Sequence, residues 1–192
     1  ARLPYHKGFR EMKILLASSS PYRRELMDRL SIRYDHKSPI VDEDKLKDDF
    51  KGAIDQLPQH LAQAKAQSLI EDNPNGLTIG SDQMALLGKE ILHKPGSEEK
   101  AEEQLARLSG QSHNLVTSIS VHGQGLWLHD TIITTLHMKK LSPEQIKNYV
   151  QKDQPLDCAG AYKIEGLGVA LFDDIKTTDF TSIIGLPLHP SW

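Results

Sequence analysis

The sequence predicts an α/β protein with a mixed β-sheet and helices packed on it. Short apolar runs that are typical of buried strands alternate with amphipathic helical segments along the whole chain. The chain opens with a strand-like run, a polar turn and a helix. Residues 113–122 and 126–138 alternate well enough to form two strands joined by a short glycine-rich turn. Strands and helices therefore interleave instead of forming separate blocks.

The first half of the chain gives clear helix and strand signals. Ser20 suits an N-cap and Pro21 suits the first position of a helix, whose inward stripe would hold Leu26, Met27 and Leu30. The acidic segment 34–49 looks like a loop. We expect strands at 13–17 and 77–79, a helix at 55–70, a turn at 73–76 and a hairpin at 84–92.

The second half continues the alternation. Ser97 and Ser142 are candidate N-caps, each followed by glutamate in the first turn of a helix. We expect helices at 97–108 and 142–151, and late strands at 169–172 and 181–184.

Composition narrows the class of protein. The 192 residues suffice for one domain with a sizeable core, and 38% of them are hydrophobic. The net charge of −3 argues against sequence-independent binding of nucleic acid, which requires an excess of Lys and Arg. No apolar run approaches the roughly 20 residues that span a bilayer, so no membrane association is expected. Cys158 is the single cysteine, which fits a cytoplasmic protein.

The two ends of the chain differ in character from the rest. Residues 1–11 are polar and without pattern, and we interpret them as a leader or a cloning remnant before a natural start at Met12. Residues 12–192 are expected to form a single domain.

The segment SSSPYRRE at 18–25 has the features of an anion site. A strand that leads into a serine-rich turn and a helix N-terminus directs free backbone N–H groups and hydroxyls, including that of Ser18, at one place. Arg23 or Arg24 could add a bidentate contact with a phosphate. The alternative is an ordinary helix cap with surface arginines.

Two acidic segments are candidates for binding a metal. Asp82 in GSDQ directly follows a predicted strand, where α/β folds often bind ligands, and it could hold a metal and orient a water. One carboxylate of VDED at 41–44 could complete a magnesium site, because Mg²⁺ takes one or two protein carboxylates and the substrate's phosphates. The alternatives are a turn aspartate and a solvated acidic loop.

Two lysines and the cysteine lie in distinctive sequence surroundings. Lys65 lies on the inward stripe of its helix and requires a partner, which a triphosphate would supply, or else it must snorkel. Lys94 precedes Pro95 just after the hairpin. No histidine spacing indicates zinc, and Cys158 is expected to be a small core residue, not a nucleophile.

In combination and order, these segments resemble the Maf family of nucleoside triphosphate pyrophosphatases. The resemblance runs from about residue 13 to residue 188. The matching stretches are LASSSPYRREL at 16–26, VDE at 41–43, LAQAKA at 61–66, IGSDQ at 79–83, HKP at 93–95, LSGQSH at 108–113, PLDCAGAYKIEGLG at 155–168 and IIGLPL at 183–188.

The resemblance implies an elongated fold with a central cleft, related to the inosine-triphosphatase fold, and metal-dependent release of pyrophosphate. A divalent cation, Mg²⁺ or Mn²⁺, is the implied cofactor. Carried over by position, Ser18 and Arg23 would bind the substrate, as would Lys65 and Lys94. The residues implied to serve the metal and the attacking water are Glu43 and Asp82, with Asp82 as proton acceptor.

The resemblance also implies a substrate. Tyr22, Gln83 and Glu165 match a branch that acts on 7-methyl-GTP, whereas a branch that acts on dTTP and UTP typically has Arg, Thr and Gln. An aromatic face attracts the cationic methylated ring by roughly 0.5–2 kcal/mol. A carboxylate can accept hydrogen bonds from guanine N1–H and N2, which uracil and thymine cannot offer.

The alternatives are a dTTP/UTP pyrophosphatase of the same family and a non-catalytic nucleotide-sensing module that inhibits cell division. The retained acids and lysines favour an enzyme over a module. A homodimer is plausible by resemblance.

Overall fold

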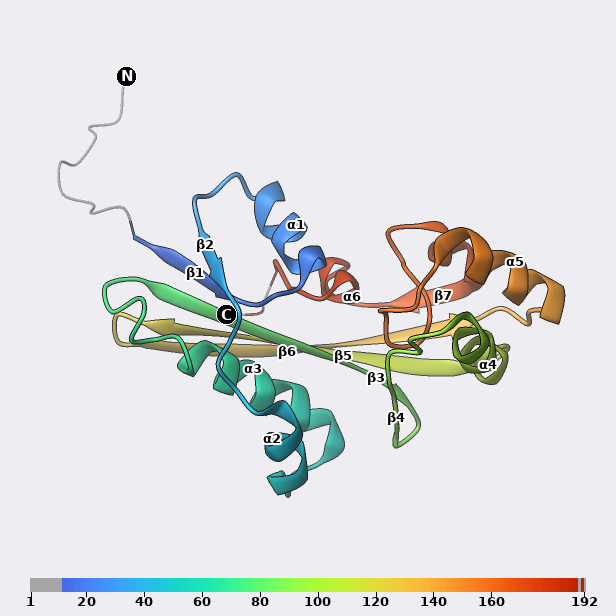
Figure 1. Ribbon diagram of the computed structural model, residues 1–192, viewed down its shortest axis with the longest axis horizontal. Coiled ribbons are helices and arrows are strands. Elements are labelled where there is room, and N and C mark those ends of the chain that lie inside the picture. Colours follow the sequence, from blue (N-terminus) through green and yellow to red (C-terminus); the bar gives the residue numbers. More distant parts are fainter. Residues whose placement is uncertain (1–11, 190, 192) are drawn as a thin grey trace.

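The computed structural model describes residues 12–189 and residue 191. Within this part, the strands form one seven-stranded sheet in the order β2-β1-β3-β5-β6-β7, with β4 paired to β3. Figure 1 shows that the molecule is elongated, because β3, β5 and β6 are long and run along it. The strands are β1 (Ile14–Ala17), β2 (Asp35–Lys37), β3 (Leu77–Leu87), β4 (Glu90–Leu92), β5 (Ser112–Gly123), β6 (Leu126–Met138) and β7 (Phe172–Lys176).

The helices lie on both sides of this sheet (Figure 1). They are α1 (Pro21–Arg29), α2 (Glu43–Asp49), α3 (Leu57–Gln67), α4 (Glu98–Leu108), α5 (Pro143–Asp153) and α6 (Thr181–Ile184), with 3-10 turns η1 (Ile54–Gln56) and η2 (Leu167–Leu171). Strand β1 runs parallel to β2 and β3, and the other pairings are antiparallel. The predicted α/β class with a mixed sheet is confirmed.

The edge of β3 is open in its middle. On one side, β1 pairs with the first part of β3 and ends at Ala17, opposite Gly80. On the same side of β3, β4 pairs only with the last part of β3, from Ala85 to Leu87. On its other side β5 pairs with β3 from Thr78 to Leu86. Residues 81–84 therefore lie in a sheet and yet leave one edge accessible to neighbouring loops and ligands.

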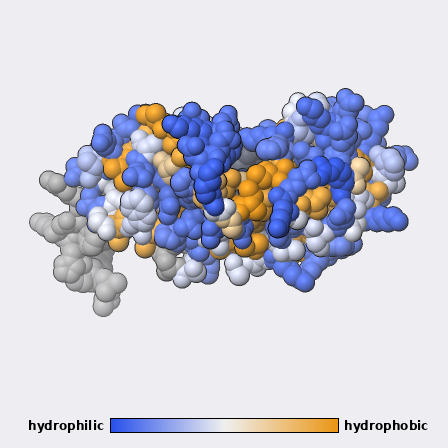
Figure 2. Space-filling model, turned by 90° about the horizontal axis from the view of Figure 1, so that it is seen from below, coloured by the Kyte–Doolittle hydropathy of each residue, from blue (hydrophilic) through white to orange (hydrophobic). Residues whose placement is uncertain are grey.

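Three apolar clusters hold the helices on the sheet. One packs α1 through Leu26 and Met27 against β1 and β5, and another packs α3 through Leu57 and Leu61 against the opposite face. The largest joins α4, α5 and the far end of the sheet around Leu136. In the view from below, apolar surface gathers near the middle of the face, with hydrophilic surface on both sides (Figure 2). Both ends of the sheet are thus held by packed helices.

Local capping explains most helix starts. The side chains of Ser20, Ser97 and Ser142 each accept a hydrogen bond from a backbone N–H in the first turn. Ser142 and Gln145 form a complete capping box. These N-termini agree with the predictions from sequence.

Several element predictions are wrong. Leu30 is the C-cap of α1 and is 44% exposed, so it does not belong to the inward stripe. The acidic segment 34–49 contains β2 and α2, because β1 offers β2 a free edge and Asp42 caps α2. Residues 181–184 form α6, not a strand, and most of 169–172 belongs to η2. Short apolar runs do not distinguish a strand from a helical turn.

The expectation for residues 1–11 lies outside the described residues, and the single-domain assignment of 12–192 stays a prediction. Among the described residues, none of the helices has the length and apolar character needed to cross a membrane.

We predict that Gly80→Ala destabilises the protein. A Cβ atom at Gly80 would lie 2.1 Å from the backbone carbonyl oxygen of Ala62, so α3 would have to move away from β3. Overpacking of this kind costs about 1–3 kcal/mol in the free energy of unfolding, measured by urea denaturation. Gly52→Ala is the control, because its new methyl would meet side-chain atoms of Phe50 and Gln56, which can rotate away. Equal stability of the two variants would contradict the prediction.

Candidate active site

A cleft of about 690 Å³ lies at the open edge of β3. Its walls come from the β1–α1 turn, α2, α3, β3, the segment after β4, the loop after α5 and the end of α6. The site residues implied by the family resemblance all line this one cleft: Ser18, Tyr22, Arg23, Glu43, Lys65, Asp82, Gln83, Lys94 and Glu165. The structure therefore brings together residues as far apart in the chain as Ser18 and Glu165.

Asp82 and Gln83 reach opposite faces of the sheet. The Asp82 carboxylate bonds to Lys65 of α3, whereas the Gln83 amide donates to the carbonyl oxygens of Ser182 and Ile183 in α6. Successive side chains on a strand point in opposite directions. Both can line one cleft because the cleft crosses the open edge of β3 from one face to the other.

The position of Asp82 corrects the sequence prediction. We expected a strand at 77–79 with Asp82 after its end, but Asp82 lies in the middle of β3. Continuous pairing with β5 carries the strand through Gly80 and Ser81, which look like turn residues in the sequence. The strand that ends here is β1, which stops opposite Gly80, so the cleft lies at the carboxyl end of β1.

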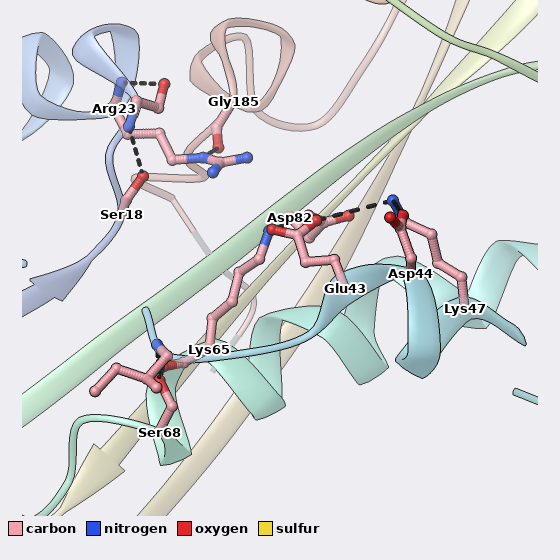
Figure 3. Close-up of polar contacts among 11 residues, drawn as sticks. Ser18, Arg23, Glu43, Asp44, Lys47, Lys65, Ser68, Asp82 and Gly185 are labelled. Carbon is pink, nitrogen blue, oxygen red and sulfur yellow. Dashed lines mark hydrogen bonds and ion pairs between the residues drawn. The ribbon is translucent and has the colours of Figure 1, made fainter. Parts of the chain in front are cut away.

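Lys65 joins the two predicted acids. Its side chain is buried, with Nζ 2.6 Å from Asp82 Oδ1 and 3.0 Å from Glu43 Oε1. The inward position was predicted correctly, and the partners that the structure shows are two carboxylates of the chain. A buried ammonium needs such compensation. Figure 3 shows the three side chains converging from α2, α3 and β3.

Glu43 is the first residue of α2, and Asp42 caps that helix by accepting from the Lys45 N–H. Burial raises the pKa of the Glu43 carboxyl, but the charges of Lys65, Lys47 and Arg23 outweigh this and hold the pKa below its ordinary value. Glu43 is therefore ionised at neutral pH.

The β1–α1 turn forms the opposite wall, shown at the upper left of Figure 3. Ser18 is buried, and its Oγ accepts from the Ser20 N–H at 3.1 Å. Ser20 Oγ in turn accepts from the Arg23 N–H at 3.4 Å. Of the two predicted arginines, Arg23 lines the cleft, whereas Arg24 Nη1 lies 3.4 Å from His36.

The Arg23 side chain is positioned by backbone. Its Nε donates to the Gly185 carbonyl oxygen at 2.7 Å, and Ser81 Oγ donates to the same oxygen at 2.9 Å. Burial lowers the pKa of the Arg23 guanidinium, and the negative charges of Asp82 and Glu43 oppose that effect. Arg23 and the two acids therefore share one electrostatic environment.

The remaining wall carries Tyr22 and Glu165. Tyr22 OH donates to Asp157 at 2.9 Å, and Glu165 and Lys94 are exposed at the rim. Cys158 corrects a prediction, because it is partly buried and lines the cleft instead of the core. Burial and the charge of Asp157 raise the pKa of its thiol to about 12, so it is no nucleophile at neutral pH.

The cleft offers a limited set of metal ligands. In the described part of the chain, no group of three or more His, Cys, Asp or Glu side chains could hold a metal ion. Glu43 and Asp82 nevertheless present two carboxylates close together, because both contact the ammonium group of Lys65. Such oxygen donors fit Mg²⁺ or Mn²⁺ when substrate phosphates complete the coordination.

The sequence model for the family described as "Maf-like protein" matches residues 13–192. The chain belongs to the Maf family. A similar protein named "7-methyl-GTP pyrophosphatase" from Bdellovibrio bacteriovorus is 44% identical, and the match covers 93% of each chain. One of the same name from Pseudomonas putida is also 44% identical, and that match covers 92% of each chain. One of the same name from Aliivibrio fischeri is 39% identical and covers 93% of this chain and 92% of its own.

A solved structure, that of the Staphylococcus aureus Ham1 protein, is similar at 17% identity and a TM-score of 0.43. It covers 81% of this chain and 89% of its own.

This Maf chain has cleft residues that sequence reasoning missed. Lys47 lines the cleft, with Nζ 3.9 Å from carboxylate oxygens of both Glu43 and Asp44. Its i, i+4 spacing from Glu43 would have been a signal had 34–49 been interpreted as helical. Asp157 and Tyr162 lie in the matching stretch PLDCAGAYKIEGLG, where only Glu165 was given a role.

A buried histidine supports this wall of the Maf cleft. His113 Nε2 lies 2.8 Å from Tyr162 OH, and Tyr162 packs edge-on against Phe172. His113 is 2% exposed, its Nδ1 has no hydrogen-bond partner in the structure, and burial lowers its pKa to about 4. The imidazole is therefore neutral in the folded Maf protein.

We predict that His113 makes the stability of the protein pH-dependent between pH 6.5 and 4. The unfolded chain binds a proton below about pH 6.5 and the folded chain only near pH 4, so acidification favours unfolding. The free energy of unfolding should fall by about 3 kcal/mol more in the wild type than in His113→Gln over this range. Urea denaturation at several pH values measures this, with exposed His129→Gln as control. Parallel pH profiles for wild type and His113→Gln would refute it.

Proposed function

We propose that this Maf protein is a nucleoside triphosphate pyrophosphatase that converts 7-methyl-GTP to 7-methyl-GMP and pyrophosphate. The observation that carries the proposal is the Lys65-bridged pair of acids, which faces the Ser18–Arg23 turn in a cleft that also holds Tyr22 and Glu165. The names of relatives at 39–44% identity support the same substrate.

The phosphate end of the cleft is built for anions. The N-terminus of α1 offers backbone N–H groups beside Ser18, and Arg23 brings a guanidinium to the same wall. Lys65 and Lys94 add two ammonium groups, one buried and one at the rim. These groups would bind the triphosphate and neutralise charge on the departing pyrophosphate.

We assign Glu43 and Asp82 as the residues that would hold a divalent cation, Mg²⁺ or Mn²⁺, together with oxygen atoms of the substrate. When bound, such a cation withdraws electron density from the phosphate oxygens. Asp82 also accepts the proton from the attacking water. The water oxygen forms a bond to the α-phosphorus as the bond to the bridging oxygen breaks, and pyrophosphate leaves.

Lys65 keeps Asp82 competent for this step. Its Nζ lies 2.6 Å from Asp82 Oδ1 and donates a hydrogen bond to it, so a positive charge lies beside the carboxylate that is to accept the proton. The contact also fixes the carboxylate, since Lys65 is itself buried and held by Glu43. Lys65 thus acts first as counter-ion to the acids and, once substrate is bound, as a partner of the phosphates.

The base end of the cleft would select the nucleotide. Tyr22 offers an aromatic face to the cationic 7-methylguanine ring, and Glu165 can accept from guanine N1–H and N2. The Gln83 amide N–H groups already donate to Ser182 and Ile183, so Gln83 would act by shaping the pocket floor beside α6. The proposed role is the removal of modified nucleotides, and the proposed location is the cytoplasm.

We predict that Asp82→Asn lowers the rate of pyrophosphate release by 10²-fold or more, because a general base contributes about 10²–10⁴-fold. Glu43→Gln should also lose most activity. Asp44→Asn is the matched control, since this neighbouring carboxylate is 97% exposed and does not line the cleft. Denaturation midpoints must show that all variants are folded. Full activity in folded Asp82→Asn would remove Asp82 from the mechanism.

We predict that kcat/KM for 7-methyl-GTP exceeds that for GTP, dTTP and UTP in the presence of Mg²⁺. Tyr22→Arg should reduce the preference for 7-methyl-GTP over GTP by about tenfold, because a cation replaces the aromatic face and repels the methylated ring. A wild-type preference for dTTP or UTP would indicate the other branch of the family. Nucleotide binding without pyrophosphate release would favour a non-catalytic sensor of cell division.

A further inference from the structure

Asp157 lies at the base end of the cleft and has no role in the reaction described so far. It is exposed and belongs to the loop after α5, whereas Tyr22 belongs to the first turn of α1. Tyr22 OH lies 2.9 Å from Asp157 Oδ2 and 3.2 Å from Oδ1, and it donates to this carboxylate. The bond joins segments 135 positions apart across the cleft.

The base end holds two carboxylates where the guanine edge needs only one. Glu165 alone can accept from both N1–H and N2 of a guanine, and Asp157 already accepts from Tyr22. The charges of both Asp157 and Glu165 act on the thiol of Cys158, which therefore lies within the electrostatic reach of each. Asp157 consequently adds negative charge beside the aromatic ring, beyond what hydrogen bonding to guanine requires.

The cleft is thus polarised along its length. In the part that holds the Lys65 ion pairs, three cations, Arg23, Lys47 and Lys65, outnumber the two acids Glu43 and Asp82. Asp157 and Glu165 make the base end anionic. Of the positive groups near Asp157, Lys163 acts on its carboxyl, but Lys163 is not among the residues that line the cleft. A ligand with an anionic triphosphate and a positively charged base matches this polarity, whereas GTP matches only the cationic part.

We propose that Asp157 is a specificity-determining residue that selects cationic, N7-alkylated purine nucleotides over neutral ones. The inference rests on the proposed function and adds a residue and a physical cause to it. Asp157 acts by its charge, and its bond to Tyr22 holds both the carboxylate and the ring against which the base would stack.

The test compares kcat/KM for 7-methyl-GTP and GTP in the wild type and three variants. Asp157→Asn removes the charge and keeps an oxygen that can accept from Tyr22 OH. Tyr22→Phe removes the hydrogen bond and keeps both ring and charge. Asp173→Asn is a control for net charge, because this exposed carboxylate does not line the cleft.

In Asp157→Asn the ratio of 7-methyl-GTP to GTP turnover should fall about two- to fivefold, the range measured for partly exposed charge pairs. The wild-type ratio should also decrease between 50 and 500 mM salt, and the Asp157→Asn ratio should decrease less, because only the charge of Glu165 remains at the base end. Tyr22→Phe should lower turnover of both nucleotides with little change in their ratio, and Asp173→Asn should change neither.

An unchanged ratio in Asp157→Asn overturns the inference and leaves the proposed function standing. The same conclusion holds if turnover of both nucleotides falls by the same factor, because a loosened loop would lower both without changing their ratio. A wild type without preference for 7-methyl-GTP overturns the proposed function, and the inference with it.

Discussion

The site depends on one ammonium group held between two carboxylates at an interrupted sheet edge. Lys65 is buried, and it is stable there because Asp82 and Glu43 approach its Nζ at 2.6 and 3.0 Å. The three residues come from β3, α2 and α3, so the ion pair also fixes how those elements meet. Removing one carboxylate would leave the buried ammonium with only one counter-charge, which costs more than losing an exposed pair. The positions of the two acids and the packing of α3 therefore depend on each other.

The interruption of the sheet is what makes that ion pair accessible. If β1 continued past Ala17, it would pair with β3 beyond Gly80 and cover the edge beside Asp82. The chain instead turns at Ser18 into α1, so backbone donors and Arg23 face the space that β1 vacates. Strand alternation then places Asp82 on one face and Gln83 on the other. Under the proposed function, the acid assigned to catalysis and the amide assigned to base selection therefore lie on opposite sides of a single strand.

Much of this could be predicted from the sequence, because local signals coincide with local structure. Ser20 and Pro21 predict where α1 begins, and helical spacing predicts that Lys65 points inward. The errors arise where contact with a segment distant in the sequence decides the secondary structure. Gly80 looks like a turn residue but lies inside β3, since β5 pairs with it throughout. Residues 181–184 have strand-like composition and form a helical turn in the structure. No local signal reports which partner a segment meets.

The Tyr22–Asp157 contact is also long-range, and no local pattern in the sequence predicts it. In the sequence, Asp157 is one acid within a motif, and nothing nearby reveals that it faces an aromatic ring of α1. The structure gives it a partner and, through the shared influence of Asp157 and Glu165 on Cys158, an electrostatic neighbourhood. Binding of a neutral purine would desolvate this second carboxylate with only the Tyr22 hydrogen bond to compensate for the lost water. For a cationic base the same charge is compensated, and this difference explains why an enzyme that acts on methylated nucleotides would keep it.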